Sequence, residues 1–273
     1  MSNCSHNCSS CSQSDCKDRN QFEIKAKDGV SFKKTIAVMS GKGGVGKSLI
    51  TSLLAVESKK RGLEVAVLDA DITGPSIPKT FGVDHLRAQG SDEGLYPVYS
   101  NGGVKIMSIN LLHEEPSMPV VWRGPVISGV VKQFYTDVLW GENDIMFIDM
   151  PPGPGDVPLT VFQSLKVDGI IVVTTPQDLV SMIVEKSVKM ANMMNIPVLG
   201  VVENMSYAVC PKCGEKLYVF GEGKTEQVAK EYGLEVLAKL PINPEVANLI
   251  DLGQVEKVDT ATIANAVNTI LEK

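Results

Sequence analysis

A glycine-rich segment near the start of the chain, GKGGVGKS at residues 41–48, constrains the fold more than any other feature of the sequence. It matches the pattern G-x-x-x-x-G-K-[ST], whose glycines let successive backbone N–H groups converge on phosphate oxygens. The motif requires a strand before it and a helix after it. Residues 35–39 are apolar and rich in β-branched side chains, and residues 48–61 place apolar residues at helical spacing before a basic last turn. The sequence therefore predicts a phosphate-binding loop between a buried strand and a helix.

Two side chains of this loop have defined chemical roles. Lys47 is expected to bridge the β- and γ-phosphates of a nucleotide, and the Ser48 hydroxyl is expected to ligate Mg²⁺. The alternative, an unoccupied glycine turn, is disfavoured by the flanking elements. The predicted nucleotide contacts are Gly41, Lys42, Gly43, Gly44, Val45, Gly46, Lys47, Ser48 and Leu49.

The rest of the chain continues to alternate strands with helices. Further strands are predicted at residues 64–68, 145–148, 169–174, 197–202 and 235–240, and further helices at residues 125–140, 179–194, 225–232 and 260–271. Residues 95–99 and 104–109 flank an Asn-Gly-Gly hairpin signal. The alternation predicts an α/β fold in a single domain, residues 33–273, with a mostly parallel sheet covered by helices on both faces. Residues 1–20 show no hydrophobic period, which predicts a flexible cysteine-rich tail.

Charge and hydropathy argue against several kinds of partner. The chain of 273 residues carries a formal net charge of −6, whereas nucleic-acid binders usually show a basic excess, so no nucleic acid is expected. No apolar run approaches the length of a membrane span, which predicts no membrane contact. The N-terminal residues lack the apolar stretch of a secretory signal, so a cytoplasmic location is expected.

Three aspartates that follow predicted strands are candidates for metal and water chemistry. Asp69 and Asp71 come directly after the strand at 64–68, and Asp149 ends the strand at 145–148. The carboxyl ends of parallel strands face the ligand crevice in a sheet of this kind. Asp71 is the candidate for orienting or deprotonating an attacking water, and Asp69 and Asp149 are candidates for holding Mg²⁺. For each acid taken alone, a solvent-exposed strand end is the alternative.

A close pair of cysteines, Cys210 and Cys213, lies in an insert near residues 207–220. The sequence CPKCG is typical of a metal knuckle, in which proline and glycine bend the chain around the ion. Zinc and iron–sulfur centres usually need four sulfur ligands, and the pair supplies two. A second copy of the chain, a cysteine pair from the tail, or no metal at all (a reactive dithiol) would each account for the pair. Structural disulfides are disfavoured because they belong to small secreted domains.

The tail contains the other cysteines, Cys4, Cys8, Cys11 and Cys16. Their spacing allows a second cluster in the tail, since clustered cysteines among serines bind several soft metals. Spacing alone does not name the metal at either cysteine cluster, so zinc remains the alternative to iron.

Seven stretches together resemble the Mrp family of iron–sulfur carrier ATPases: GKGGVGKS at 41–48, DADITGPSIP at 69–78, WRGP at 122–125, DMPPGPGD at 149–156, VENMS at 202–206, CPKCG at 210–214 and LPINP at 240–244. The resemblance implies a P-loop NTPase fold of the SIMIBI or MinD-like class. It also implies that Lys42 reaches across a dimer to the partner's phosphates, as the early lysine of this deviant P-loop does. Asn204 is implied to hydrogen-bond the adenine, with the backbone near Pro241 and Ile242 completing the base pocket. The alternatives are a solvated loop lysine at 42 and a turn-forming asparagine at 204.

The function implied by the resemblance is that of an iron–sulfur cluster carrier. Such a protein binds and slowly hydrolyses ATP, holds a [4Fe–4S] cluster between the two subunits of a homodimer, and passes it to apo iron–sulfur proteins. The alternative is a MinD- or ParA-like spatial organiser with a structural zinc knuckle. That class favours a basic amphipathic C-terminal helix, whereas residues 260–273 contain only one basic residue, Lys273. A redox role like that of the nitrogenase iron protein is disfavoured because that relative uses well-separated single cysteines.

Overall fold

The computed structural model describes residues 24–112, 124–153, 155–176 and 180–273. The predicted tail at 1–20, with the candidate ligands Cys4, Cys8, Cys11 and Cys16, lies outside the described residues. So do the first residues of the WRGP stretch and the first residue of the helix predicted at 179–194. The expectations for these residues therefore stay predictions.

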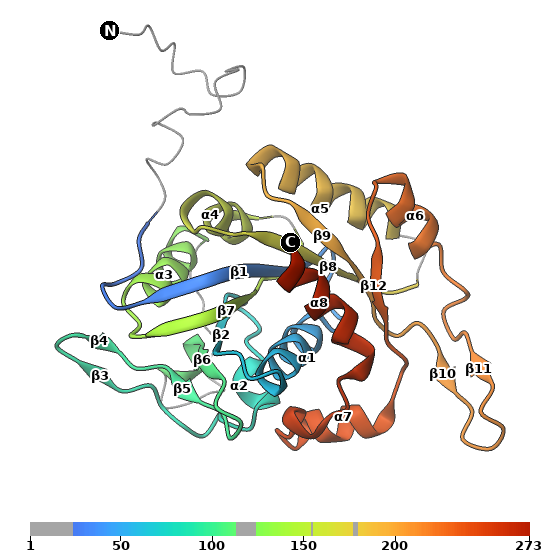
Figure 1. The fold of residues 1–273 in the computed structure, drawn as a ribbon, viewed down its shortest axis with the longest axis horizontal. Coiled ribbons are helices and arrows are strands. Elements are labelled where there is room, and N and C mark those ends of the chain that lie inside the picture. The colour runs from blue at the N-terminus through green and yellow to red at the C-terminus, as the bar shows by residue number, and fades with distance from the viewer. Residues whose placement is uncertain (1–23, 113–123, 154, 177–179) are drawn as a thin grey trace, which may run out of the picture.

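An eight-stranded sheet runs through the centre of the described chain (Figure 1). The strand order is β12-β9-β8-β1-β7-β2-β6-β5, and each neighbouring pair is parallel except the antiparallel pair β5–β6. The central strands are apolar because both faces of the sheet are covered. The strands are β1 Ser31–Ser40, β2 Val65–Asp69, β5 Val98–Tyr99, β6 Lys105–Met107, β7 Glu142–Asp149, β8 Gly169–Thr174, β9 Val198–Glu203 and β12 Val236–Lys239.

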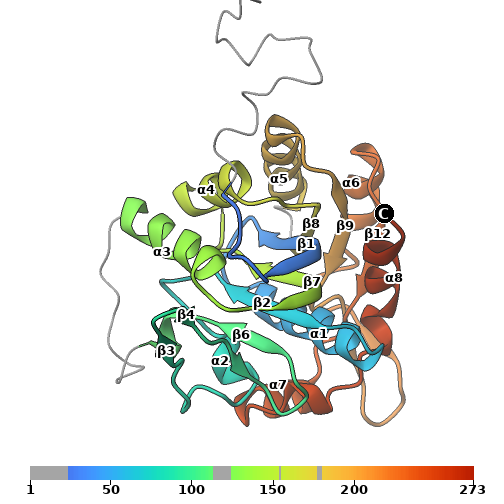
Figure 2. The same ribbon diagram turned by 60° about the vertical axis from the view of Figure 1, so that its left-hand side comes forward.

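Helices cover both faces of this sheet, as Figure 2 shows from a second direction. One face carries α1 (Lys47–Lys60), α2 (Ile77–Thr80), α7 (Pro244–Asp251) and α8 (Ala264–Glu272). The opposite face carries α3 (Gly124–Thr136), α4 (Asp156–Ser164), α5 (Val180–Met194) and α6 (Thr225–Glu231). Short 3-10 turns at Ile109–Leu111, Val255–Lys257 and Ala261–Ile263 complete the helical segments.

The protein has one hydrophobic core on each face of the sheet, because side chains along a strand point to the two faces in turn. In β1, Ile36 and Val38 pack into the core under α1 and α8, whereas Ala37 and Met39 pack into the core under α3, α4 and α5. Successive strand residues point to opposite faces, so one apolar strand supplies both cores. The predicted α/β fold with a mostly parallel, doubly covered sheet is confirmed.

Some predicted elements differ from the observed ones in length or continuity. The strand predicted at 95–99 is interrupted: Gly94–Leu95 (β4) pairs with Gly90–Ser91 (β3), and Val98–Tyr99 pairs with β6 in the hairpin signalled by Asn-Gly-Gly. The helix predicted at 260–271 begins as a 3-10 turn and becomes α-helical at Ala264. No residue range was predicted for α2, α4 or α7, each of which spans nine residues or fewer.

The predicted cysteine insert forms a small antiparallel hairpin at the edge of the molecule (Figure 1). Its strands are β10 (Ala208–Val209) and β11 (Lys216–Leu217). The hairpin follows the end of β9 and returns to the body of the protein at the start of α6.

Candidate nucleotide site and cysteine hairpin

The phosphate-binding loop connects β1 with α1, as predicted. Gly44 and Gly46 have φ angles of 78° and 80°, values that favour glycine. Gly46 also lies against Asn204, and a Cβ atom at this position would collide with the Asn204 side chain. The positive φ angle of Gly46 and the close approach of Asn204 together explain why the residue immediately before Lys47 is glycine.

Asp149 accepts three polar contacts from the loop and the first turns of α1. Ser48 Oγ donates to Asp149 Oδ2 at 2.6 Å, and Thr51 Oγ1 donates to Asp149 Oδ1 at 2.6 Å. Lys47 Nζ lies 2.7 Å from Asp149 Oδ2 in an ion pair that is almost fully buried. Asp149 ends β7, where β1 and β2 flank it on either side. The structure thus brings together the predicted phosphate-binding lysine and two predicted Mg²⁺ ligands.

Asp69, the register partner of Asp149 on β2, is completely buried. It accepts hydrogen bonds from Ser108 Oγ at 3.0 Å and from the Asp71 backbone N–H at 3.2 Å. Burial and the negative charge of Asp149 raise the pKa of Asp69 to about 8. Burial disfavours the charged form of Asp69, and an ionised Asp149 on the neighbouring strand would repel it, so both effects favour the protonated carboxyl.

Asp71, which lies two residues after the end of β2, is only partly buried. Its Oδ1 accepts hydrogen bonds from Thr73 Oγ1 at 3.1 Å and from the Gly74 N–H at 3.3 Å. Burial raises the pKa of Asp71, and the nearby Lys47 opposes the shift. Of the two acids at the end of β2, Asp71 is therefore the one that solvent reaches.

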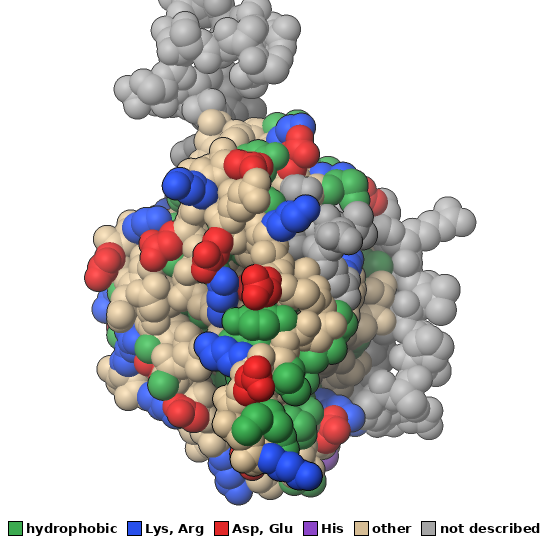
Figure 3. All heavy atoms as spheres, turned by 90° about the vertical axis from the view of Figure 1, so that its right-hand side faces the viewer, with side chains coloured by type: hydrophobic (Ala, Val, Ile, Leu, Met, Phe, Trp, Pro, Cys, Tyr) green, Lys and Arg blue, Asp and Glu red, His purple; other side chains and the backbone are tan. Residues whose placement is uncertain are grey.

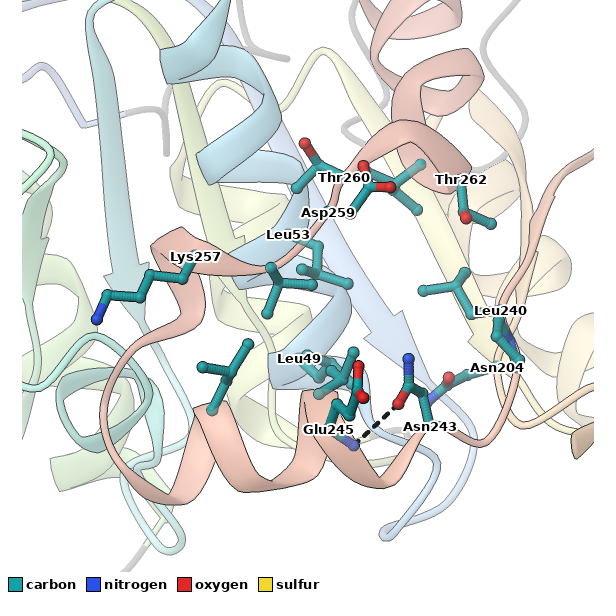
Figure 4. A pocket seen from close by; sticks show the side chains of 15 residues that line it. Leu49, Leu53, Asn204, Leu240, Asn243, Glu245, Lys257, Asp259, Thr260 and Thr262 are labelled. Atoms are coloured by element: carbon teal, nitrogen blue, oxygen red, sulfur yellow. Dashed lines mark hydrogen bonds between the residues drawn. The ribbon is translucent and has the colours of Figure 1, made fainter. Parts of the chain in front are cut away.

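A pocket of about 360 Å³ lies beside the phosphate-binding loop, between α1 and α7 (Figure 4). The predicted contacts Leu49, Asn204 and Pro241 line it, and Asn204 Nδ2 donates to the Val45 backbone oxygen at 3.0 Å. The second N–H and the Oδ1 of Asn204 can still hydrogen-bond a nucleotide base. The other lining residues, which the sequence did not indicate, are Leu53, Leu240, Asn243, Glu245, Val246, Leu249, Lys257, Val258, Asp259, Thr260, Thr262 and Ile263.

Ile242 does not line this pocket. Its N–H instead donates to the Tyr207 backbone oxygen at 2.7 Å, and Ile242 forms a β-bridge with Ala208 at the root of the cysteine hairpin. Asn243, which follows, caps α7 by accepting a hydrogen bond from the Glu245 N–H at 2.9 Å. The LPINP stretch thus connects the pocket to the hairpin.

Cys210 and Cys213 lie together in the turn of the hairpin. The Gly214 N–H donates to the Cys210 backbone oxygen at 2.9 Å, which closes the turn. The backbone N–H groups of Cys213 and Lys212, followed by the Cys213 thiol, lower the pKa of the Cys210 thiol. Cys213 is exposed to solvent. Two adjacent thiols in a turn whose N–H groups favour thiolate fit a soft metal.

Within the described ranges, no group of three or more histidine, cysteine or acidic side chains is arranged to hold a metal ion. The hairpin therefore supplies two sulfur ligands by itself. Large hydrophobic residues of the hairpin are exposed to solvent, among charged residues such as Lys212, Glu215 and Lys216. The exposed hydrophobic residues are Val209, Leu217, Tyr218, Val219 and Phe220. Figure 3 faces the side of the molecule that carries the hairpin and shows hydrophobic side chains exposed between charged ones.

A family profile described as ParA, NUBPL iron-transfer P-loop NTPase, matches residues 31–273. The chain belongs to this family. The match spans both the nucleotide site and the cysteine hairpin, and it confirms the resemblance inferred from the seven sequence stretches. The chain is therefore a P-loop NTPase.

Relatives in the family are similar along most of their length. Proteins named iron-sulfur cluster carrier protein from Methanocaldococcus jannaschii and Clostridium perfringens are each 43% identical to this chain, over 260 and 266 residues. The two matches cover 93% and 92% of this chain, and 90% and 93% of the relatives.

Solved structures agree with the fold. A nucleotide-binding protein from Archaeoglobus fulgidus, in complex with ADP and with Co found in it, has 47% identity and a TM-score of 0.75. That match covers 84% of this chain and 89% of the other. MinD from Pyrococcus horikoshii, complexed with Mg-ADP, has 18% identity and a TM-score of 0.59 over 89% of this chain and 95% of the other. At that identity MinD shows the fold alone, and the similarity confirms the predicted MinD-like fold. No helix among the described residues is long and apolar enough to cross a membrane.

Proposed function

We propose that this protein is an ATP-dependent iron–sulfur cluster carrier, which assembles a cluster on its cysteine hairpin and passes it to apo-proteins. The observation that carries the proposal is the pair of free thiols on the hairpin, the half-buried Cys210 and the exposed Cys213. They are half of a four-sulfur ligand set on a chain of an iron-transfer NTPase family. The names of the relatives from M. jannaschii and C. perfringens support the same function.

The nucleotide site is assigned from the contacts around Asp149. ATP phosphates would occupy the loop at 41–48, where Lys47 exchanges its ion pair with Asp149 for the β- and γ-phosphates. Mg²⁺ would be held by Ser48 and Asp149, with Asp69 behind them, and it would supply positive charge that neutralises the phosphates. Asp71, the acid that solvent reaches, would orient the attacking water. Lys42 would supply charge to the phosphates of a second subunit.

A homodimer would complete the metal site, because two hairpins related by a two-fold axis supply four thiolates. The cargo on this arrangement would be a [4Fe–4S] cluster. Free thiols favour a reducing compartment, which supports the cytoplasm as the location. The net charge of −6 supports partners other than nucleic acid, and no membrane partner is proposed.

A MinD- or ParA-like spatial organiser is not favoured. MinD itself is 18% identical to this chain, a level that supports a common fold, whereas the relatives named as cluster carriers are 43% identical. Slow ATP hydrolysis would set the geometry of the dimer and so control release of the cluster.

Anaerobic purification followed by cluster transfer to an apo-ferredoxin tests the proposal. We expect a brown protein whose iron content and visible absorption are lost in Cys210→Ser and Cys213→Ser. Lys47→Ala, in contrast, should retain iron but slow its transfer. Cys16→Ser removes a candidate ligand of the tail, and it should keep the iron that the hairpin holds. A colourless protein containing zinc instead of iron would overturn the carrier assignment, and normal transfer by Lys47→Ala would overturn its dependence on ATP.

A further inference from the structure

Glu203, the last residue of β9, lies at the root of the cysteine hairpin and is 2% exposed. Ser206 Oγ lies 2.7 Å from Glu203 Oε1 and 3.1 Å from the Glu203 backbone oxygen, and it shares its proton between them. The residue between Asn204 and Ser206, Met205, has a φ angle of 56°, which is uncommon outside glycine. The Glu203 carboxylate therefore holds a strained turn directly before the hairpin begins.

The second carboxylate oxygen faces the segment that returns from the hairpin. Glu203 Oε2 is buried and has no hydrogen-bond partner among the described residues. A Cβ atom built on Gly223 would lie 3.2 Å from this oxygen and 2.9 Å from Pro176 Cβ, so the returning chain passes close against the carboxylate. Glu203 thus contacts both ends of the insert. A buried, unpaired carboxylate oxygen is costly, so a purely structural role would be filled better by an apolar residue.

The same turn is connected to the nucleotide site. Asn204 donates to the backbone oxygen of Val45 in the phosphate-binding loop. The Leu240 N–H donates to the Glu203 backbone oxygen at 2.8 Å, and the Ser206 N–H donates to the Leu240 backbone oxygen at 2.8 Å. Leu240 and Asn204 both line the pocket between α1 and α7. The wall of the pocket and the root of the hairpin are therefore one hydrogen-bonded unit.

We propose that Glu203 is a positioning residue that makes the conformation of the Cys210–Cys213 turn depend on nucleotide occupancy. A nucleotide that engages Asn204 shifts the turn at Met205, and the carboxylate transmits the shift to both ends of the insert. The inference rests on the nucleotide site of the proposed function but not on the identity of the metal.

Thiol reactivity in the full-length, reduced, metal-free protein tests this role. The rate at which iodoacetamide modifies Cys213 is measured by peptide mass spectrometry with and without saturating ADP. In the wild type we expect ADP to change the rate about fivefold or more, the usual lower range of coupling between sites. In Glu203→Gln the ratio should fall toward one, while ADP affinity and the thermal midpoint stay within the range of the control. Ser206→Ala removes the hydroxyl that donates to Oε1 and to the Glu203 backbone oxygen. It should lower the ratio as well, and it replaces Glu203→Gln as the test if Glu203→Gln does not fold.

Glu93→Gln is the matched control, because Glu93 is an exposed carboxylate in the turn between β3 and β4, away from both ends of the insert. It should keep the wild-type ratio. Equal rates with and without ADP in the wild type would overturn the proposal, and so would a wild-type ratio in Glu203→Gln. Neither result depends on iron, so a failure here is separate from a failure of the carrier function.

Discussion

At the scale of single residues, Asp69 gives the ligand-free protein a defined dependence on pH. Its pKa is raised from 3.8 to about 8, first by burial and then by the charge of Asp149. In the unfolded chain the group ionises near its ordinary value, so between about pH 4 and pH 8 the folded chain binds one more proton than the unfolded chain. The free energy of unfolding therefore falls as the pH rises through this window, by at most about 1.4 kcal/mol per pH unit for this group.

Asp69→Asn should remove this dependence, because the amide does not titrate. Urea unfolding midpoints, measured between about pH 6 and pH 8 without nucleotide or Mg²⁺, should fall less steeply with pH in the variant than in the wild type. Asp92→Asn, at an exposed position, is the control and should retain the wild-type slope. Identical slopes for wild type and Asp69→Asn would show that Asp69 is already ionised in the folded protein.

At the scale of elements, two glycines let α7 touch the segment after α2. Gly82 and Gly253 have φ angles of 69° and 68°, and a Cβ atom on Gly253 would lie 2.8 Å from Gly82 N and closer still to Gly82 Cα. Gly253→Ala should destabilise the protein by about 1–3 kcal/mol more than a glycine-to-alanine change that costs only φ strain. Because α7 lines the pocket with Val246 and Leu249, the same variant should bind ADP more weakly.

Gly233→Ala separates the destabilisation caused by φ strain from that caused by the steric collision. Gly233 has a φ angle of 67°, and nothing lies within 4 Å of its Cβ position, so this variant pays the φ strain without a collision. Denaturant unfolding and ADP titration of both variants give the comparison. Equal loss of stability and unchanged ADP affinity in the two variants would show that the contact between α2 and α7 does not position the pocket.

Elements were predictable from the sequence where burial is continuous. All six residues of β8 are buried, and β1 alternates between two cores, so their apolar runs identified them. The helix α7 was not predicted, because none of its residues is fully buried and it is only eight residues long. In the site, the glycine motif indicated Lys47 and Ser48, but the pairing of Asn204 with Val45 joins residues 159 apart. Local spacing carries no information about such a contact, and the same holds for the wall of the pocket formed by Asp259 and Thr262.

At the scale of the whole molecule, the hairpin of one chain supplies only half of the four sulfur ligands that a zinc or iron–sulfur centre usually needs. It offers two thiols, and the side chains around them, including Val219 at 60% exposure and Leu217 at 49%, leave apolar surface in water. Exposed apolar surface of this kind is typical of a protein–protein contact. A two-fold axis at the hairpin would bring four thiolates together and bury this surface at the same time.

Iron loading is therefore expected to convert the chain from monomer to dimer. After anaerobic reconstitution, sedimentation should give twice the 29.4 kDa of one chain, with about two iron atoms per chain if one four-iron cluster is shared. Cys213→Ser should remain at the mass of one chain, because the variant cannot complete a four-sulfur site. The variant with serine in place of Cys4, Cys8, Cys11 and Cys16 is the control for the tail, and it should still dimerise with iron. If that variant instead lost its iron while Cys213→Ser kept it, the cluster would reside on the tail and the hairpin would not be a subunit contact.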